Sequence, residues 1–240
     1  MKLLVIIPAY NEEENIRRVV SNLAENYPQY DYVVVNDGSK DDTAKICREN
    51  GYHLINLPVN MGLTAAVQTG MKYAYQNGYD YALQFDADGQ HMAEYIGPML
   101  EKSGEGYDIV IGSRFCEKKK PASLRMLGSR LLGFIIRMTT GKTIKDPTSG
   151  MRLFGKRIIK EFATAFNFGP EPDTISYLIK RGASYVEVQV DMCERIAGVS
   201  YLNWANSMRY MLQMCISILF MQRARKTERF QTETDEVTPV

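Results

Sequence analysis

The sequence predicts an α/β protein built on a mostly parallel β-sheet with helices on both faces. Short apolar runs alternate with helix-like segments between residues 3 and 112, which is the pattern of a doubly wound sheet. Small polar residues follow these apolar runs, at the carboxyl ends of the expected strands, where such sheets bind their ligands. The 240-residue length suits one large domain or two small ones.

Five strands are expected in the first half. The first, residues 3–7, is a continuous apolar run, typical of a strand buried on both faces. The others are expected at residues 32–35, 52–57, 80–85 and 108–112. Helices are expected from Asn11 and the acids after it to about residue 27, from about Asp41 with Ser39 or Asp41 as cap, and at residues 64–76 and 92–102.

The alternation of strand-like and helix-like segments becomes less regular after residue 114. We expect a helix at 123–140, turns at 146–150 and 169–173, a helix from there to about 181, a strand at 185–190, and a long helix from 201 to about 225. The last residues are polar and acidic, which predicts disorder. The expected organisation is a catalytic domain at 1–200, an amphipathic interfacial or packing helix at 201–226 and a disordered tail at 227–240.

Composition excludes several classes of protein. A net charge of +1 implies no bulk attraction to nucleic acid, so no nucleic-acid partner is expected. Four cysteines without C-x-x-C spacing indicate neither a disulfide framework nor a zinc site, and they suit a reducing cytosol. The N-terminal apolar run is too brief for a signal peptide. No stretch reaches the roughly 18–20 apolar residues of a membrane span.

The most informative motif is Asp86-Ala87-Asp88-Gly89-Gln90, at the end of the expected fourth strand. Two neighbouring carboxylates repel each other unless a cation lies between them. Hard divalent ions such as Mg²⁺ or Mn²⁺ prefer oxygen ligands of this kind together with the oxygens of a bound phosphate. The motif therefore predicts a metal site, and the alternative is a polar loop that happens to contain two Asp residues.

Several motifs occur in a characteristic order. In the first half they are Ile7–Glu12, Val35–Ser39, Asn60–Leu63 and Asp86–His91, and in the second half Gly112–Arg114, Arg125 with Ser129, Thr148–Arg152 and Glu194–Ser200. Together they resemble the family-2 nucleotide-sugar glycosyltransferases of GT-A fold, above all the polyprenyl-phosphate branch of dolichyl-phosphate mannose synthase-like enzymes. The resemblance covers residues 1 to about 202.

The resemblance implies a metal-dependent, inverting transfer of a hexose from a UDP- or GDP-sugar. It assigns the metal, Mg²⁺ or Mn²⁺, to Asp86, Asp88 and Gln90, with Asp88 counted as catalytic. It places the nucleotide-sugar near Pro8, Ala9, Tyr10, Glu12, Asp37 and Asp86. Asp37 follows a strand end, where its carboxylate can accept from base or ribose donors, although an Asx turn that merely starts a helix would also explain it.

The nature of the acceptor decides which other residues matter. A lipid phosphate is already an anion at neutral pH, so it needs cations rather than a base, and Arg is suited to bidentate phosphate capture. The candidates are Arg114, which is also counted as catalytic, Arg125, Ser129 and Arg195. Arg125 and Ser129 are one helical turn apart and can face one ligand. The alternative for each Arg is a solvated surface charge.

A sugar hydroxyl as acceptor would instead require a carboxylate base. Asp146 is the best candidate for that base, and Glu171 and Asp173 are weaker ones. Two further alternatives are a nucleotide-sugar-binding subunit without catalysis, which the intact Asp-x-Asp motif argues against, and a nucleotidyltransferase. The absence of a Gly-rich phosphate loop near the N-terminus disfavours the nucleotidyltransferase.

The helix after residue 200 carries an apolar stripe and ends in basic residues. Its stripe comprises Trp204, Met208, Met211, Leu212, Cys215, Ile218 and Leu219. Such a helix could lie in a membrane interface or pack on the domain or on another chain. Because the implied acceptor is a lipid, we expect a peripheral protein on the cytoplasmic, inner face of the membrane, with Lys118–Lys120 attracted to anionic headgroups. A small membrane-protein partner or a homo-oligomer is a further expectation.

Overall fold

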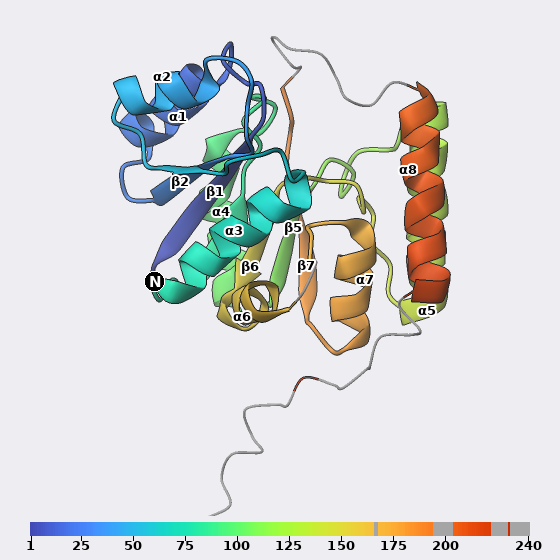
Figure 1. Ribbon diagram of the computed structural model, residues 1–240. Helices are drawn as coiled ribbons and strands as arrows, with labels where there is room; N and C mark the ends of the chain where they lie inside the picture. The colour runs from blue at the N-terminus through green and yellow to red at the C-terminus, as the bar shows by residue number, and fades with distance from the viewer. Residues whose placement is uncertain (166–167, 194–203, 222–229, 231–240) are drawn as a thin grey trace, which may run out of the picture.

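The computed structural model describes residues 1–165, 168–193, 204–221 and 230. Its centre is a seven-stranded sheet with the order β3-β2-β1-β4-β6-β5-β7 (Figure 1). The strands are β1 Leu3–Ala9, β2 Asp31–Asn36, β3 Leu54–Asn56, β4 Tyr81–Gln84, β5 Ile109–Ser113, β6 Arg152–Gly155 and β7 Tyr185–Gln189. β6 runs antiparallel to β4 and β5, and the remaining neighbours are parallel.

Helices cover both faces of this sheet. They are α1 Ile16–Asn26, α2 Thr43–Glu49, α3 Leu63–Gln76, α4 Ile96–Gly104, α5 Leu124–Thr140, α6 Lys156–Thr164, α7 Pro172–Lys180 and α8 Trp204–Ile216, with a 3₁₀ turn Ala93–Tyr95 before α4 and a π turn Ser217–Met221 after α8. Alternate residues of β1 point to opposite faces. Leu4 and Ile6 pack in a core with α3, α5, α6, α7 and α8, whereas Val5 and Ile7 pack in a second core with α1, α2 and α4.

The predicted α/β class and mostly parallel sheet are therefore confirmed, with helices on both faces. The five strands of the first half lie where they were expected, although the third is shorter than predicted. The first helix begins at Ile16 rather than directly after Asn11. Asn11 has a φ of 54°, in the left-handed region, and lies in the turn before the helix, whose N-cap position is occupied by Asn15.

The sequence analysis missed β6 and α6. β6 contains only four residues, Arg152–Gly155, and follows directly on the turn at 146–150. A run this short carries no usable periodicity. Strand β6 matters for the site, because it inserts between β4 and β5 and brings the turn at 146–150 beside the end of β4.

The C-terminal segment is described in part. Residues 204–221 are helical, with Met211, Cys215 and Ile218 buried. The rest of the predicted helix and the predicted tail at 227–240 lie outside the described residues, apart from Phe230, so the predicted boundaries stay predictions. Within the part of the chain that the structure describes, no helix combines the length and apolar character that crossing a membrane requires.

Candidate active site

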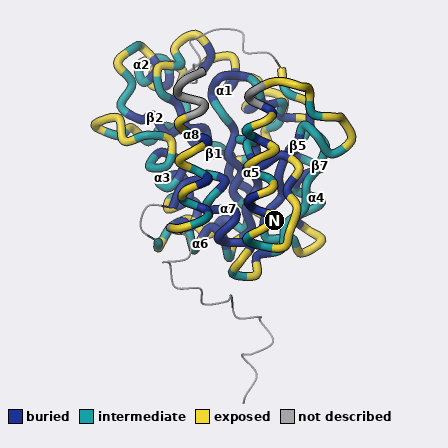
Figure 2. Tube along the Cα trace, turned by 90° about the vertical axis from the view of Figure 1, so that its right-hand side faces the viewer, coloured by how far each residue is buried: buried dark blue, intermediate teal, exposed yellow. Residues whose placement is uncertain are grey.

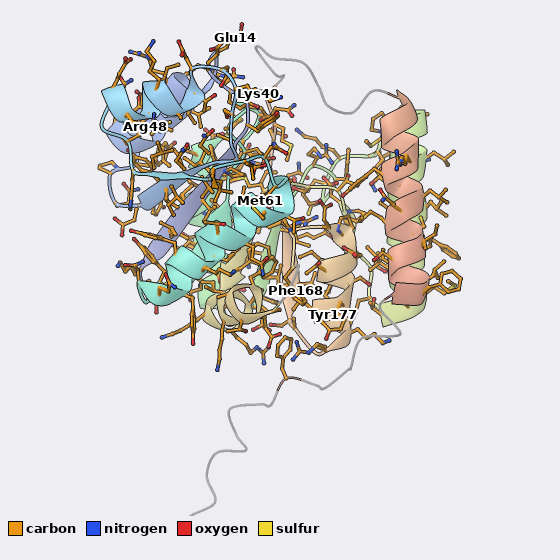
Figure 3. The ribbon with its side chains drawn as sticks, in the orientation of Figure 1. Glu14, Lys40, Arg48, Met61, Phe168 and Tyr177 are labelled. Carbon is orange, nitrogen blue, oxygen red and sulfur yellow. The ribbon has the colours of Figure 1, made fainter. Side chains whose placement is uncertain are left out.

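The loops that follow β1 and β2 join at one edge of the sheet. The backbone N–H of Asn11 donates to Ser39 Oγ at 2.9 Å, and that of Lys40 donates to Asn11 Oδ1 at 2.9 Å. The N–H of Glu12 donates to Thr43 Oγ1 at 2.8 Å. Figure 3 shows Lys40 and Glu14 at this same edge. Parallel strands bring their carboxyl ends together, so the polar residues after each strand meet as the sequence predicts.

A polar hollow of about 340 Å³ lies between these two loops. It is lined by residues 11–15 together with Lys40 and Asp41. This volume is at the lower end of the range for small-molecule sites. Glu12 lines the hollow, and its Oε2 accepts from the side-chain amide of Asn15 at 2.8 Å. Of the other predicted nucleoside contacts, Pro8 and Ala9 are buried in β1 and Tyr10 is half-buried just after it.

Asp37 is almost fully buried, and both of its carboxylate oxygens have backbone partners. Oδ1 accepts from the N–H of Met61 and Oδ2 from the N–H of Gly62, each at 2.8 Å. The carboxylate thus anchors the loop that starts α3 (Met61 is labelled in Figure 3). Gly38 allows this approach, because a Cβ there would lie 2.4 Å from the Val59 carbonyl carbon. The predicted nucleoside contact of Asp37 stays a prediction.

The two carboxylates after β4 differ in exposure. The side chain of Asp86 is 33% exposed, whereas Asp88 is buried. Asp86 Oδ1 accepts from the side-chain amide of Gln84 at 2.9 Å. Asp88 Oδ1 accepts from the backbone N–H of Gln90 at 3.0 Å, which closes the turn between them. The amide of Gln90 itself donates to the Cys193 carbonyl at 3.4 Å.

The imidazole ring of His91 contacts both the backbone and the carboxylate of Asp86. The backbone N–H of Asp86 donates to His91 Nδ1 at 2.9 Å, so in the neutral ring the proton is on Nε2. Nε2 lies 3.6 Å from Asp86 Oδ2. The sequence analysis did not count His91 among the site residues, although its place in the motif was the available signal. His91 positions Asp86 rather than facing solvent.

Gly150 brings the backbone of a distant turn against the same carboxylate. A Cβ at Gly150 would lie 2.5 Å from Asp86 Oδ2 and 3.3 Å from His91 Cε1. Any larger residue would therefore displace the Asp86 carboxylate. This contact depends on β4 pairing with β6, in which Gln84 is opposite Arg152.

The arrangement fits a divalent ion that completes its coordination with ligand oxygens. Asp86 and Asp88 supply hard oxygen donors, which suit Mg²⁺ and Mn²⁺. In the described part of the chain, no group of three or more His, Cys, Asp and Glu side chains forms a self-sufficient metal cage. Because Asp86 is partly exposed, an ion bound by these two carboxylates would have further coordination positions open to the oxygens of a diphosphate.

Asp146 forms a very different site with Arg114. Arg114 Nε donates to Oδ2 at 2.7 Å and Nη2 to Oδ1 at 2.8 Å, and the Arg114 backbone N–H also donates to Oδ2 at 3.1 Å. Burial alone would raise the pKa of the Asp146 carboxyl, but the hydrogen bonds and charge of Arg114 outweigh it and hold this pKa below its ordinary value. A fully buried carboxylate with a low pKa is a weak proton acceptor, which disfavours Asp146 as a base.

A second cation lies beside Arg114. The Arg114 guanidinium and the Lys120 ammonium are 5.2 and 5.4 Å from the ring centroid of Phe115. Lys120 Nζ donates to the buried Ser129 Oγ at 2.9 Å, and burial lowers the pKa of Lys120. Lys120, which the sequence analysis had assigned to a headgroup-binding loop, therefore contacts Ser129 and shares the Phe115 ring with Arg114.

The other predicted acceptor residues cannot be placed. Arg195 and the side chain of Arg125 lie outside what the structure describes. Glu171 and Asp173 contact the C-terminal helix: Tyr210 Oη donates to Glu171 Oε2, and Ser217 Oγ donates to Asp173 Oδ2 at 2.5 Å. Burial raises the pKa of Glu171 despite that hydrogen bond.

The fold and this pair of strand-end carboxylates define the class of nucleotide-sugar glycosyltransferases of GT-A fold. More particularly, the chain belongs to glycosyltransferase family 2, whose family model, "Glycosyl transferase family 2", matches residues 4–162. It is therefore an enzyme that transfers a sugar, and the predicted family is confirmed.

Two relatives support the predicted polyprenyl-phosphate branch. UDP-N-acetylglucosamine–dolichyl-phosphate N-acetylglucosaminyltransferase of Methanococcus voltae is 36% identical over 66% of this chain and 71% of its own length. Polyprenol monophosphomannose synthase of Mycolicibacterium smegmatis is 29% identical over 85% of this chain and 82% of its own.

A solved structure supports the fold. Glucosyl-3-phosphoglycerate synthase from Mycobacterium tuberculosis, in complex with Mn²⁺, uridine diphosphate and glucosyl-3-phosphoglycerate, superposes with a TM-score of 0.62 at 20% identity. The match covers 94% of this chain and 81% of that one. At this identity the likeness shows the GT-A fold alone.

Proposed function

We propose that the enzyme transfers a hexose from a UDP- or GDP-sugar to a polyprenyl phosphate such as undecaprenyl phosphate. The transfer inverts the anomeric centre and takes place at the cytoplasmic face of the membrane, to which the protein binds peripherally. The relatives named for dolichyl and polyprenol phosphates support this acceptor class. The synthase structure with Mn²⁺ and uridine diphosphate supports the donor class and the metal.

The observation that carries this proposal is the half-open Asp86–Asp88 pair. Gln84, His91 and Gly150 fix the Asp86 carboxylate in place. Held by Asp86, Asp88 and Gln90, Mg²⁺ or Mn²⁺ would anchor the donor diphosphate and stabilise the negative charge on the departing nucleotide. The loops around the 340 Å³ hollow, together with Asp37, are proposed to bind the nucleoside.

The acceptor side needs cations rather than a base. A phosphate oxygen attacks the anomeric carbon, the bond to the donor diphosphate breaks, and the nucleoside diphosphate leaves. Lys120 and Arg114 form a cationic corner for that phosphate, and the fully buried Ser129 accepts from Lys120 and positions its ammonium group. The ion pair between Asp146 and Arg114 supports a phosphate acceptor over a hydroxyl, because it weakens Asp146 as a proton acceptor.

The direct test is incubation with a panel of radiolabelled UDP- and GDP-sugars and undecaprenyl phosphate. We expect label in an acid-labile lipid product, and none when undecaprenol replaces the phosphate. Excess EDTA should abolish the product and added Mn²⁺ should restore it. Full turnover in EDTA would refute the metal role. If neither lipid product nor slow hydrolysis of the donor is observed, the protein binds nucleotide-sugars without catalysing transfer.

A further inference from the structure

Two helices outside the catalytic edge expose a continuous set of large apolar side chains. On α5 these residues recur at helical spacing, and on α8 and its π turn they recur every four residues. The set is Leu127, Leu131, Phe134, Met138, Leu212, Ile216 and Phe220, with exposures from 48% to 66%. We name these seven residues the α5–α8 face. Figure 1 shows α5 and α8 side by side, and Figure 2 looks onto their exposed side.

The helices that form this face are firmly packed on their other side. Leu132 and Ile136 of α5 are buried in the core together with Met211 and Ile218. Gly128 permits the close approach of the two helices, because a Cβ there would lie 3.1 Å from Met211 Cγ. Each helix therefore has one apolar side that the domain covers and a second that it leaves exposed. A helix that only packs on its own domain needs the first side alone.

The charged residues on the two helices themselves are of one sign. Arg130, Arg137 and Arg209 are exposed there, and neither α5 nor residues 204–221 contain an Asp or Glu. Packing this face against that of a second copy would bring arginines together in a low-dielectric interface, which is unfavourable. A bilayer with anionic headgroups offers both an apolar phase for the seven side chains and negative charge for the arginines.

The inner side of α5 reaches the proposed acceptor corner, where Ser129 accepts from Lys120, and α8 packs closely against α5 at Gly128. A lipid whose phosphate occupied that corner would have its chain close to the same two helices. Resting on the proposed function, we propose that the α5–α8 face docks the enzyme on an anionic lipid bilayer. Its apolar side chains enter the boundary between headgroups and acyl chains, and its arginines contact lipid phosphates.

The test is co-sedimentation of the full chain with phosphatidylcholine vesicles that contain or lack phosphatidylglycerol. We expect binding to the anionic vesicles, and a loss of at least about tenfold in the variant Phe134→Glu/Ile216→Glu, because charges must then enter the apolar boundary. Replacing Arg130, Arg137 or Arg209 by Gln should weaken binding about fivefold each. The matched control is Val59→Glu/Tyr75→Glu, which changes two exposed apolar residues elsewhere and should bind like wild type.

Circular dichroism and thermal unfolding verify that each variant is folded. Unchanged vesicle binding by folded Phe134→Glu/Ile216→Glu overturns the proposal. So does a dimer in analytical ultracentrifugation without lipid that these substitutions dissolve, because the occupant is then a second copy.

Transfer to a short-chain, water-soluble isoprenyl phosphate separates the docking from the chemistry. A wild-type enzyme that uses this acceptor but ignores vesicles refutes the docking and leaves the proposed function intact. One that binds vesicles but transfers sugar to neither acceptor refutes the function instead.

Discussion

Two carboxylate sites, one directly after β4 and one in the turn before β6, show how the same residue type acquires different burial and different partners. Asp146 is fully buried and held by two hydrogen bonds from the Arg114 side chain, so its charge is neutralised within the fold. Asp86 is 33% exposed, and its side-chain partners described above are the amide of Gln84 and the ring of His91. A buried carboxylate needs a cation, as Asp146 has in Arg114, or hydrogen-bond donors, as Asp37 has in two backbone N–H groups, whereas a half-exposed one leaves oxygen atoms open to a ligand.

The largest expected effect distinguishes the ligand site. Asp88→Ala should lower kcat/KM by a factor on the order of 1,000 or more, because charge stabilisation at the leaving group is lost. The free energy of unfolding should fall by only about 1 kcal/mol, because the hydrogen bond from the Gln90 N–H is lost while the repulsion between the two carboxylates is relieved. Steady-state transfer assays and urea unfolding measure the two quantities. The control Asp42→Ala removes an exposed carboxylate paired with Lys45 and should remain active.

The second prediction concerns the Arg114–Asp146 pair, whose loss should lower the free energy of unfolding. Asp146→Asn leaves the Arg114 guanidinium without its counter-charge, which should lower the free energy of unfolding by about 3 kcal/mol. Urea unfolding checks this value. Removing both charges, in Arg114→Met/Asp146→Asn, should recover part of the loss. If Asp146→Asn kept full stability and lost all transfer, Asp146 would be a base and the contrast between the two sites would fail.

A smaller effect is expected from the glycine that touches Asp86. Gly150→Ala should weaken Mn²⁺ affinity about 10- to 100-fold, because the added Cβ would displace the supported carboxylate. Electron paramagnetic resonance titration of Mn²⁺ in the presence of uridine diphosphate measures this without turnover. Gly97→Ala is the matched control, since a Cβ there meets Tyr30 Oη at an ordinary 3.7 Å. Equal Mn²⁺ affinity in the two variants would contradict the positioning role.

The smallest expected effect is the pH dependence of the stability difference between wild type and Asp146→Asn. The pKa of Asp146 is lower in the folded protein than its ordinary value, so its pairing stabilises the fold above about pH 4. That contribution is lost as the pH falls through the lower folded-state value. In urea unfolding, the stability gap between wild type and Asp146→Asn should therefore narrow below about pH 4. A gap that stayed constant down to pH 3 would show that the carboxylate is not the stabilising form.

Much of the site was visible as local pattern. Asp86, Asp88 and Gln90 stand in one short motif, and the polar residues after β1 and β2 follow buried runs that periodicity identifies. The supporting residues were not visible in this way. Gly150 meets Asp86 only because β6 pairs with β4, and a four-residue strand gives no periodic signal. His91 lies in the same motif as Asp86, but the motif does not show that its ring accepts from the Asp86 backbone N–H. Lys120 was counted among surface lysines, because nothing local indicates that it turns toward Ser129.

By itself, the sequence determined which residues gather at the edge of the sheet, because the carboxyl ends of parallel strands share that edge whatever the loops do. Only the tertiary structure decided which acid is paired with a cation inside the fold. Arg114 and Asp146 are 32 residues apart, and their pairing in a buried site depends on the long segment between them. Burial and partner geometry set the charge and reach of a carboxylate, and neither is encoded in its neighbours along the chain.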